Sequence, residues 1–293
     1  MMKSPSPIIL VKPIIKSVRC LDLFDSVSVE GQLDVTLHTG YRIPRVILSG
    51  TADELAHVKV YVINGQLFIS NRNKQQEFPI HADIQTSTLT GFLYYGQGTI
   101  NAPQLQADLS LLRIKNPGST HLSGNIMLHR IELQSAGQVK IDGVKAYSLD
   151  VSLEDNAVLE LHGMTRLSNL SLKGKGTLGL YWVNSKRLKI RATDYIHLRL
   201  AGKVDLLDLE IRDYVNVNAR YLRAQSAFVK TFGHSVASIT TLDKQHALAT
   251  EGSDIYFYEI PRIKSHFMAY DGSILDMRDW HEWSLKDYNR YNK

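Results

Sequence analysis

A short pattern returns every 19 or 20 residues through the final two thirds of this chain, and that period constrains the fold more than any single residue does. A repeat this short and dense indicates one structural unit stacked many times. The returns begin at Gly98, Gly118, Gly137, Ala157, Gly176, Ile196, Val215, His234, Ser253 and Gly272. Two residues after each start stands an aliphatic residue or a threonine: Ile100, Thr120, Val139, Leu159, Leu178, Leu198, Val217, Val236, Ile255 and Ile274.

Apolar and polar residues alternate within each repeat, which is typical of strands with one buried face. A second inward position follows four residues after each start and is apolar in most repeats: Ala102, Leu122, Ile141, Leu161, Leu180, Leu200, Ala219, Ser238, Phe257 and Asp276. A second alternating pair recurs at Leu112/Ile114, Ile131/Leu133, Val151/Leu153, Leu170/Leu172, Ile190/Ala192 and Leu209/Ile211. Glycines six residues after a start, at Gly124, Gly143, Gly163 and Gly202, indicate tight corners.

One such unit cannot bury its apolar edges alone, but stacked copies form a continuous core in which each coil pairs its backbone amides with its neighbours. The sequence therefore predicts an all-β protein, a single-stranded parallel β-helix with coils of about 19–20 residues. Crossovers between parallel strands are overwhelmingly right-handed, so we expect a right-handed solenoid.

The residues before the repeat alternate as strands do, although not on the same period. Asn64-Gly65 between two apolar runs predicts a hairpin, and Ala52–His57 has the character of a helical turn. Stacked repeats need a cap that covers their open edge, so this region is interpreted as an N-terminal β cap. We expect four segments: an irregular leader (1–19), the N-terminal β cap with the first coils (20–97), the parallel β-helix (98–277) and a C-terminal cap or tail (278–293).

Composition excludes several classes of protein. The 34 basic and 29 acidic residues are interspersed without a basic run, so we expect no nucleic-acid binding. A single cysteine, Cys20, excludes an intrachain disulfide and a cysteine-based zinc site. No stretch has the roughly 20 apolar residues of a membrane-spanning helix. Lys12, Pro13 and Lys16 interrupt the apolar N-terminal stretch, so no clear signal peptide is predicted.

The best candidates for a ligand site are two acidic residues and the tyrosines that follow them. Asp194 and Asp213 stand two residues before successive repeat starts, so their carboxylates are expected on neighbouring coils. Tyr195 and Tyr214 are then expected to stack, either as a platform for a sugar or simply to stabilise a corner. Paired carboxylates suit glycoside hydrolysis or Ca²⁺ binding, but aspartate is also favoured at corners because it bonds nearby amides. The histidines fall in different repeat positions, so no shared metal site is expected.

Several segments resemble a known bacterial family, described as putative auto-transporter adhesin, head GIN domain. The likeness spans about residues 20–277. It rests on the segments Phe24–Gly31, Leu33–Leu37, Val60–Ser70, Ser135–Gly143, Glu251–Pro261 and Asp271–Ile274. The resemblance implies a right-handed β-helix and a role at the cell envelope or surface. It supplies no catalytic residues, and this chain differs from the family pattern where Ala157, Ile196, Val215 and His234 replace marker glycines.

The resulting expectation is a non-enzymatic bacterial surface or envelope protein, an adhesin whose β-helix displays a binding surface. It predicts an envelope, periplasmic or secreted location, no cofactor or metal, and a surface glycan or a host or envelope protein as partner. Two alternatives stay open. One is a carbohydrate-active enzyme, a polysaccharide lyase or hydrolase, that uses Asp194 and Asp213; the other is an oligomeric scaffold whose open coil ends pair with another protomer.

Overall fold

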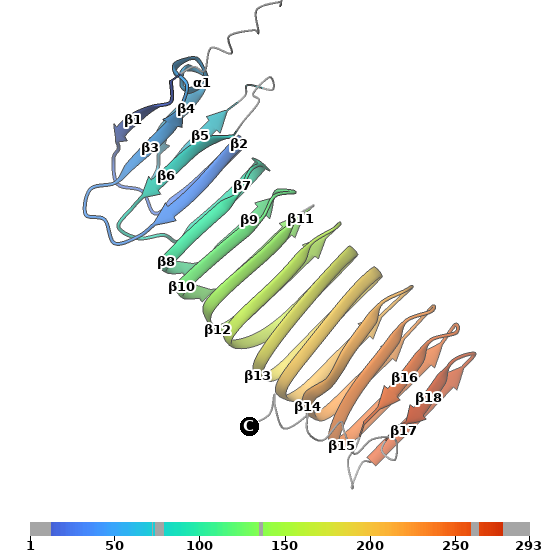
Figure 1. Ribbon diagram of the computed structural model, residues 1–293. Helices are drawn as coiled ribbons and strands as arrows, with labels where there is room; N and C mark the ends of the chain where they lie inside the picture. The colour runs from blue at the N-terminus through green and yellow to red at the C-terminus, as the bar shows by residue number, and fades with distance from the viewer. Residues whose placement is uncertain (1–12, 72, 74–78, 135–136, 259–263, 278–293) are drawn as a thin grey trace, which may run out of the picture.

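Each repeat folds as one coil, and the coils stack in parallel along a common axis to form a rod (Figure 1). The computed structural model describes residues 13–71, 73, 79–134, 137–258 and 264–277. Within these residues it is a β-solenoid of about nine turns. The predicted all-β stacked fold is therefore confirmed.

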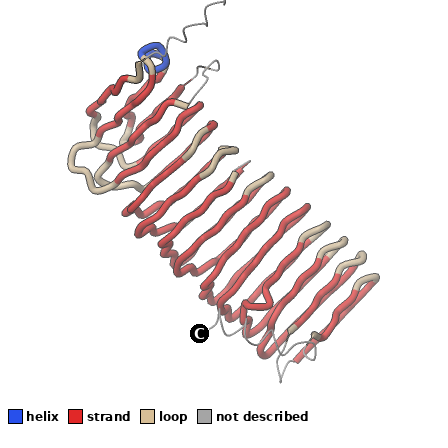
Figure 2. The backbone as a smooth tube through the Cα atoms, in the orientation of Figure 1, coloured by secondary structure: helices blue, strands red, loops and turns tan. Residues whose placement is uncertain are grey.

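The described residues hold 18 strands and one short helix, all strands belonging to one continuous sheet. In chain order the elements are β1 (Ile15–Cys20), β2 (Ser26–His38), β3 (Arg45–Gly50), α1 (Ala52–Ala56), β4 (Val58–Ile63), β5 (Gln66–Asn71), β6 (Ile80–Gln85), β7 (Gly91–Gln97), β8 (Ile100–Leu109), β9 (Leu111–Lys115), β10 (Thr120–Leu128), β11 (Arg130–Gln134), β12 (Gln138–Glu154), β13 (Val158–Ile211), β14 (Asn216–Thr231), β15 (Val236–Thr250), β16 (Asp254–Phe257), β17 (Lys264–Tyr270) and β18 (Ser273–Asp276). Figure 2 shows how little loop separates the strands, so that β13 alone runs through several turns.

The register between coils confirms most of the predicted inward positions. Thr120 pairs with Val139, and Leu198 pairs with Val217, each inward side chain lying above its counterpart in the next coil. The second apolar pair stacks in the same way, as Ile131 on Val151 shows. Because these side chains are almost fully buried, they form one hydrophobic core that continues from coil to coil.

One predicted position in the repeat is wrong. Val217 pairs with Ala237 and Ala237 with Ile255, so the eighth coil begins at Ser235 rather than at His234. Ala237 and Ile239 are buried, whereas the expected inward residues Val236 and Ser238 are partly exposed. Compared with the predicted repeat, the coil before Ser235 is one residue longer and the coil that starts at Ser235 is one residue shorter. The two differences cancel, so the regular spacing of the later starts did not reveal the shift.

The N-terminal region joins the solenoid through β2. This strand pairs in parallel with β5 and β6 on one side and with β7 and β8 on the other. The antiparallel pairs β1–β3, β3–β6 and β4–β5 complete the layer at this end. The predicted hairpin is confirmed, with Asn64 and Gly65 at φ values of 51° and 74°, and α1 confirms the helical turn.

Part of the expected leader is regular structure. Ile15–Cys20 forms β1, because this segment lies after Pro5, Pro7 and Pro13, the residues that disfavour regular structure in the leader, and pairs along β3. Residues 1–12 lie outside the described residues, as does the expected tail 278–293. The division of the chain into four segments stays a prediction.

Glycine at the predicted corners is required by close packing between coils. A Cβ atom on Gly124 (φ 142°) would lie 2.1 Å from the carbonyl oxygen of Leu105 in the preceding coil. Gly163 and Gly202 meet the same obstacle from the backbone of the coil before them. The corner therefore lets successive coils approach closely enough for their backbones to pair.

Candidate functional site

The predicted acidic residues lie at one corner of the solenoid, where the backbone of successive coils takes a left-handed conformation. The residues at this position, with their φ values, are Asp155 (59°), Gly174 (98°), Asp194 (70°), Asp213 (69°), Gly233 (64°) and Glu251 (59°). Glycine adopts positive φ freely, and aspartate and asparagine do so more readily than most residues. The backbone requirement thus accounts for the recurrence of aspartate and glycine here.

Asp194 and Asp213 lie on neighbouring coils, as predicted, and their carboxylates bond to the backbone. The N–H of Gly174 donates to Oδ2 of Asp194 over 3.1 Å, and the N–H of Asp194 donates to Oδ2 of Asp213 over 3.3 Å. Each aspartate therefore joins its own coil to the preceding one. This arrangement agrees with the corner role that the sequence offered as an alternative to catalysis.

Directly after these acids, Tyr195 and Tyr214 form an exposed stack. Their ring centroids lie 5.0 Å apart and the ring planes differ by 1°. His234 continues the stack 5.3 Å from Tyr214, and Nζ of Lys175 lies 5.4 Å from the centroid of Tyr195. We call Lys175, Tyr195, Tyr214 and His234 the corner ladder.

The geometry of the corner ladder decides which surface it offers to a ligand. Tyr195 and Tyr214 are about half exposed, at 48% and 50%, yet each ring has a neighbour on both of its faces. Consequently the rings present their edges and hydroxyl groups to solvent, and a sugar has no free tyrosine face to stack on. The idea of a sugar-stacking platform is therefore not supported. The hydroxyl groups at the exposed ring edges can still form hydrogen bonds with a ligand.

A shallow hollow adjoins the corner ladder and adds further polar groups. It is lined by Asn156, Val158, Lys175, Gly176, Thr177, Tyr195 and His197. The amide, hydroxyl, ammonium and imidazole groups in this set can donate or accept hydrogen bonds. The ladder and the hollow together thus form one continuous polar surface. From the sequence, Gly174-Lys175-Gly176 only superficially resembles a phosphate loop and is interpreted as a β corner, so Lys175 is assigned no role in binding there.

The site lacks the features expected of a metal centre. In the part of the chain that the structure describes, no group of three or more histidine, cysteine, aspartate or glutamate side chains is placed to hold a metal ion. The expectation that the histidines occupy different positions is nevertheless wrong in one place, because His246 and His266 stack with centroids 5.1 Å apart. They belong to a second ladder that begins at Phe228, on another face.

A further polar cluster joins three coils on the face formed by the first strand of each coil. Oδ2 of Asp142 lies 3.0 Å from Nε2 of His121, and its Oδ1 lies 2.7 Å from Nδ1 of His162. Partial burial opposes ionisation of Asp142, but the hydrogen bonds from both imidazoles, together with Lys140, lower its pKa overall. The cluster holds coils together and places no side chain near the corner ladder.

Comparison with known proteins gives one family match. The model of the family described as putative auto-transporter adhesin, head GIN domain, matches residues 23–193. No curated protein matches the chain. Across the described residues, no helix has the length and apolar character needed to cross a membrane.

Several solved structures are similar over most of their length. A putative adhesin from Parabacteroides merdae ATCC 43184 is 11% identical, with a TM-score of 0.48, and the match covers 90% of this chain and 95% of that one. A putative adhesin from Parabacteroides distasonis ATCC 8503 is 12% identical, with a TM-score of 0.47, covering 90% and 97%. A putative lipid binding protein from the same strain is 13% identical, with a TM-score of 0.44, covering 90% and 96%.

Proposed function

This chain belongs to the family described as putative auto-transporter adhesin, head GIN domain, and on that premise we propose that it is a non-enzymatic surface protein of adhesin type whose corner ladder contacts the ligand. The family description supports a surface or envelope role. The ligand-binding role of Asp194, Asp213, Tyr195 and Tyr214 is part of the proposal.

The exposed stack of Tyr195 on Tyr214 is the observation that carries the proposal. Binding normally costs conformational entropy because mobile side chains become ordered at the interface. Two rings already held parallel, between Lys175 and His234, lose little further freedom on binding. The ladder is thus a preorganised row of hydrogen-bonding groups.

The chemistry of this row favours a neutral, hydroxyl-rich ligand such as a cell-surface glycan. Tyrosine hydroxyls both donate and accept, and Asn156 and Thr177 in the adjoining hollow do the same. Asp194 and Asp213 support the ligand-binding edge indirectly, since their carboxylates fix the backbone from which the two tyrosines project. Each acid thus has a structural role at the corner that does not require catalysis.

Removing the two hydroxyls while keeping both rings tests the proposal. The variant Y195F/Y214F is compared with the parent on an array of neutral glycans, and Y61F/Y270F, which removes two exposed hydroxyls elsewhere, is the matched control. We expect about tenfold weaker glycan binding for Y195F/Y214F, since a hydrogen bond contributes roughly 0.5–1.5 kcal/mol. Equal binding by Y195F/Y214F and the parent would contradict the proposal.

A turnover assay tests the non-enzymatic part separately. The parent is incubated with the polysaccharides that bind, and the release of reducing ends is followed. We expect no release from the parent or from D194N/D213N. Turnover by the parent that disappears in D194N/D213N would show that the acids are catalytic.

A further inference from the structure

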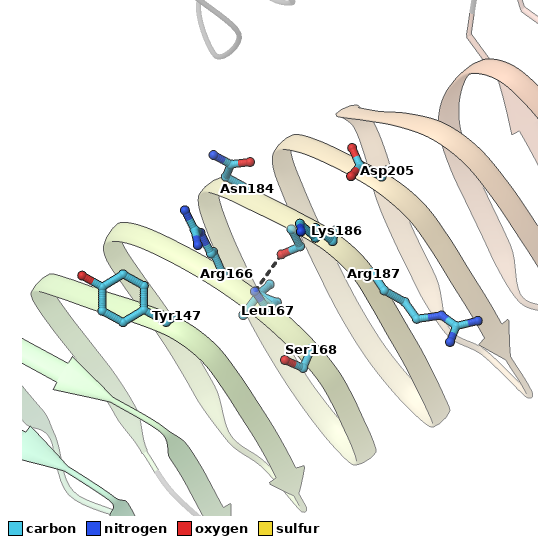
Figure 3. Close-up of a pocket in the computed structure, with 9 residues that line it drawn as sticks. Tyr147, Arg166, Leu167, Ser168, Asn184, Lys186, Arg187 and Asp205 are labelled. Carbon is cyan, nitrogen blue, oxygen red and sulfur yellow. Dashed lines mark hydrogen bonds between the residues drawn. The ribbon is translucent and has the colours of Figure 1, made fainter.

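A second surface, on a different face of the rod, gathers positive charge from two neighbouring coils. Arg166, Lys186 and Arg187 line a hollow that also includes Tyr147 and Asp205 (Figure 3). None of these three cations forms an ion pair with any residue that the structure describes. The three cations and the carboxylate of Asp205 leave a net charge of +2 in the hollow.

Arginines on the face formed by the last strand of each coil are arranged differently. Several of them are neutralised by a carboxylate on the same or the next coil. The pairs are Arg113–Glu132, Arg130–Asp150, Arg191–Asp208 and Arg212–Glu210. The three cations of the hollow have no such carboxylate partner among the described residues.

A buried hydrogen bond fixes the floor of this hollow. The N–H of Leu167 donates to Oγ of Ser185 over 2.8 Å, joining two neighbouring coils. Arg166 and Lys186 are the residues directly beside this bond, one on each coil, so their spacing is set by the stacking of the backbone (Figure 3). The hydroxyl of Ser185 is thereby engaged by the fold, whereas the cations point away from this bond as groups that a ligand can reach.

Two further features prepare the hollow for an extended partner. Tyr147 is 66% exposed, and the guanidinium carbon of Arg166 lies 5.8 Å from its ring centroid, which is within range of a cation–π contact. Ser168 and Asn184 place a hydroxyl and an amide beside the charges. Oγ of Ser168 already lies 2.5 Å from Oγ of Ser148, and a hydroxyl oxygen keeps further capacity to accept a hydrogen bond. The hollow is open and runs along several coils, a shape that suits a linear chain better than a small enclosed anion.

We propose that this hollow binds an acidic polysaccharide, with its carboxylate or sulfate groups on Arg166, Lys186 and Arg187 and its hydroxyls on Ser168 and Asn184. This surface is separate from the corner ladder and does not depend on the function proposed for it. Guanidinium groups pair with carboxylate and sulfate oxygens through two parallel N–H donors, which favours arginine at such a position.

The test uses the full chain and two triple variants of equal net charge. R166Q/K186Q/R187Q removes the cations of the hollow, and K59Q/K173Q/R199Q removes three exposed cations that do not line it. Binding to immobilised polygalacturonate and to dextran sulfate is measured at two salt concentrations, with neutral dextran as the uncharged probe. Unchanged circular dichroism and melting of both variants shows that the fold is retained; if the triple variant unfolds, R166Q and R187Q are measured singly.

We expect R166Q/K186Q/R187Q to bind about tenfold more weakly and with a shallower salt dependence, while K59Q/K173Q/R199Q stays within about twofold of the parent. A difference between polygalacturonate and dextran sulfate assigns the anionic group. Equal losses in both triple variants would show general attraction of charge and overturn the proposal. Phosphatidylglycerol vesicles and duplex DNA are tested in the same way. If either binds more tightly than the polysaccharides and loses binding in R166Q/K186Q/R187Q, the assignment of an acidic polysaccharide as the ligand is overturned.

Discussion

At the residue scale, backbone conformation explains the acidic column at the corner. Asp194 and Asp213 have φ values near 70°, and Gly174 (98°) and Gly233 (64°) at the same place in neighbouring coils are also left-handed, so the conformation is common to the column while the carboxylate is not. The sequence predicted that the two acids lie on adjacent coils and that the tyrosines stack. It could not reveal that ring faces are covered by Lys175 and His234, because that depends on side-chain packing.

Substitution at Asp213 separates the conformational requirement from the hydrogen bond. Asp213→Gly removes the carboxylate that accepts from the N–H of Asp194. We expect this to lower the free energy of unfolding by about 0.5–1.5 kcal/mol. Asp213→Val loses the bond and also places a β-branched residue at positive φ, which we expect to cost about 1–2 kcal/mol more. Urea denaturation measures both variants. Equal midpoints for the glycine and valine variants would show that the left-handed conformation is not required.

At the element scale, alternation predicted the strands well because each coil buries one side of every strand. The eighth coil was misplaced because alanine at position 237 is a weak hydrophobic signal, and because a longer and a shorter coil compensate each other around Ser235. The His121–Asp142–His162 cluster could not be predicted either. Its members are 20 or 21 residues apart, and only the stacking register brings their side chains into contact.

The pH dependence of stability tests the role of Asp142 in joining coils. Its pKa is lowered in the folded state, so its contribution is fully present above the ordinary aspartate pKa of about 3.9 and is lost as the pH falls through the lower, folded value. At pH 5 we expect Asp142→Asn to have a lower melting temperature than the parent. The loss in free energy of unfolding should be about 1 kcal/mol or less, because the cluster is partly exposed. In acid the two melting temperatures should converge. A constant difference across this range would rule out an ionised bridge.

At the scale of the whole molecule, the solenoid determines which residues lie side by side on the surface. Residues 19 or 20 positions apart become neighbours, so Tyr195 stacks on Tyr214, and Arg166 lines the same hollow as Lys186, although each pair is far apart in sequence. Composition showed interspersed charge, from which we expected no nucleic-acid binding. That inference missed the basic hollow because charge clustering in a solenoid follows the coil period instead of the linear order.

Engineered disulfide formation tests the central claim that the coil register builds the corner ladder. In a Cys20→Ser background, Y195C/Y214C places two thiols on adjacent coils, where strands lie about 4.8 Å apart and a disulfide spans Cα distances of roughly 4.4–6.8 Å. Y195C/H234C places them two coils apart, about 10 Å. On mild oxidation we predict an intrachain disulfide in Y195C/Y214C and none in Y195C/H234C. Equal cross-linking in both, or only in Y195C/H234C, would contradict the stacked register.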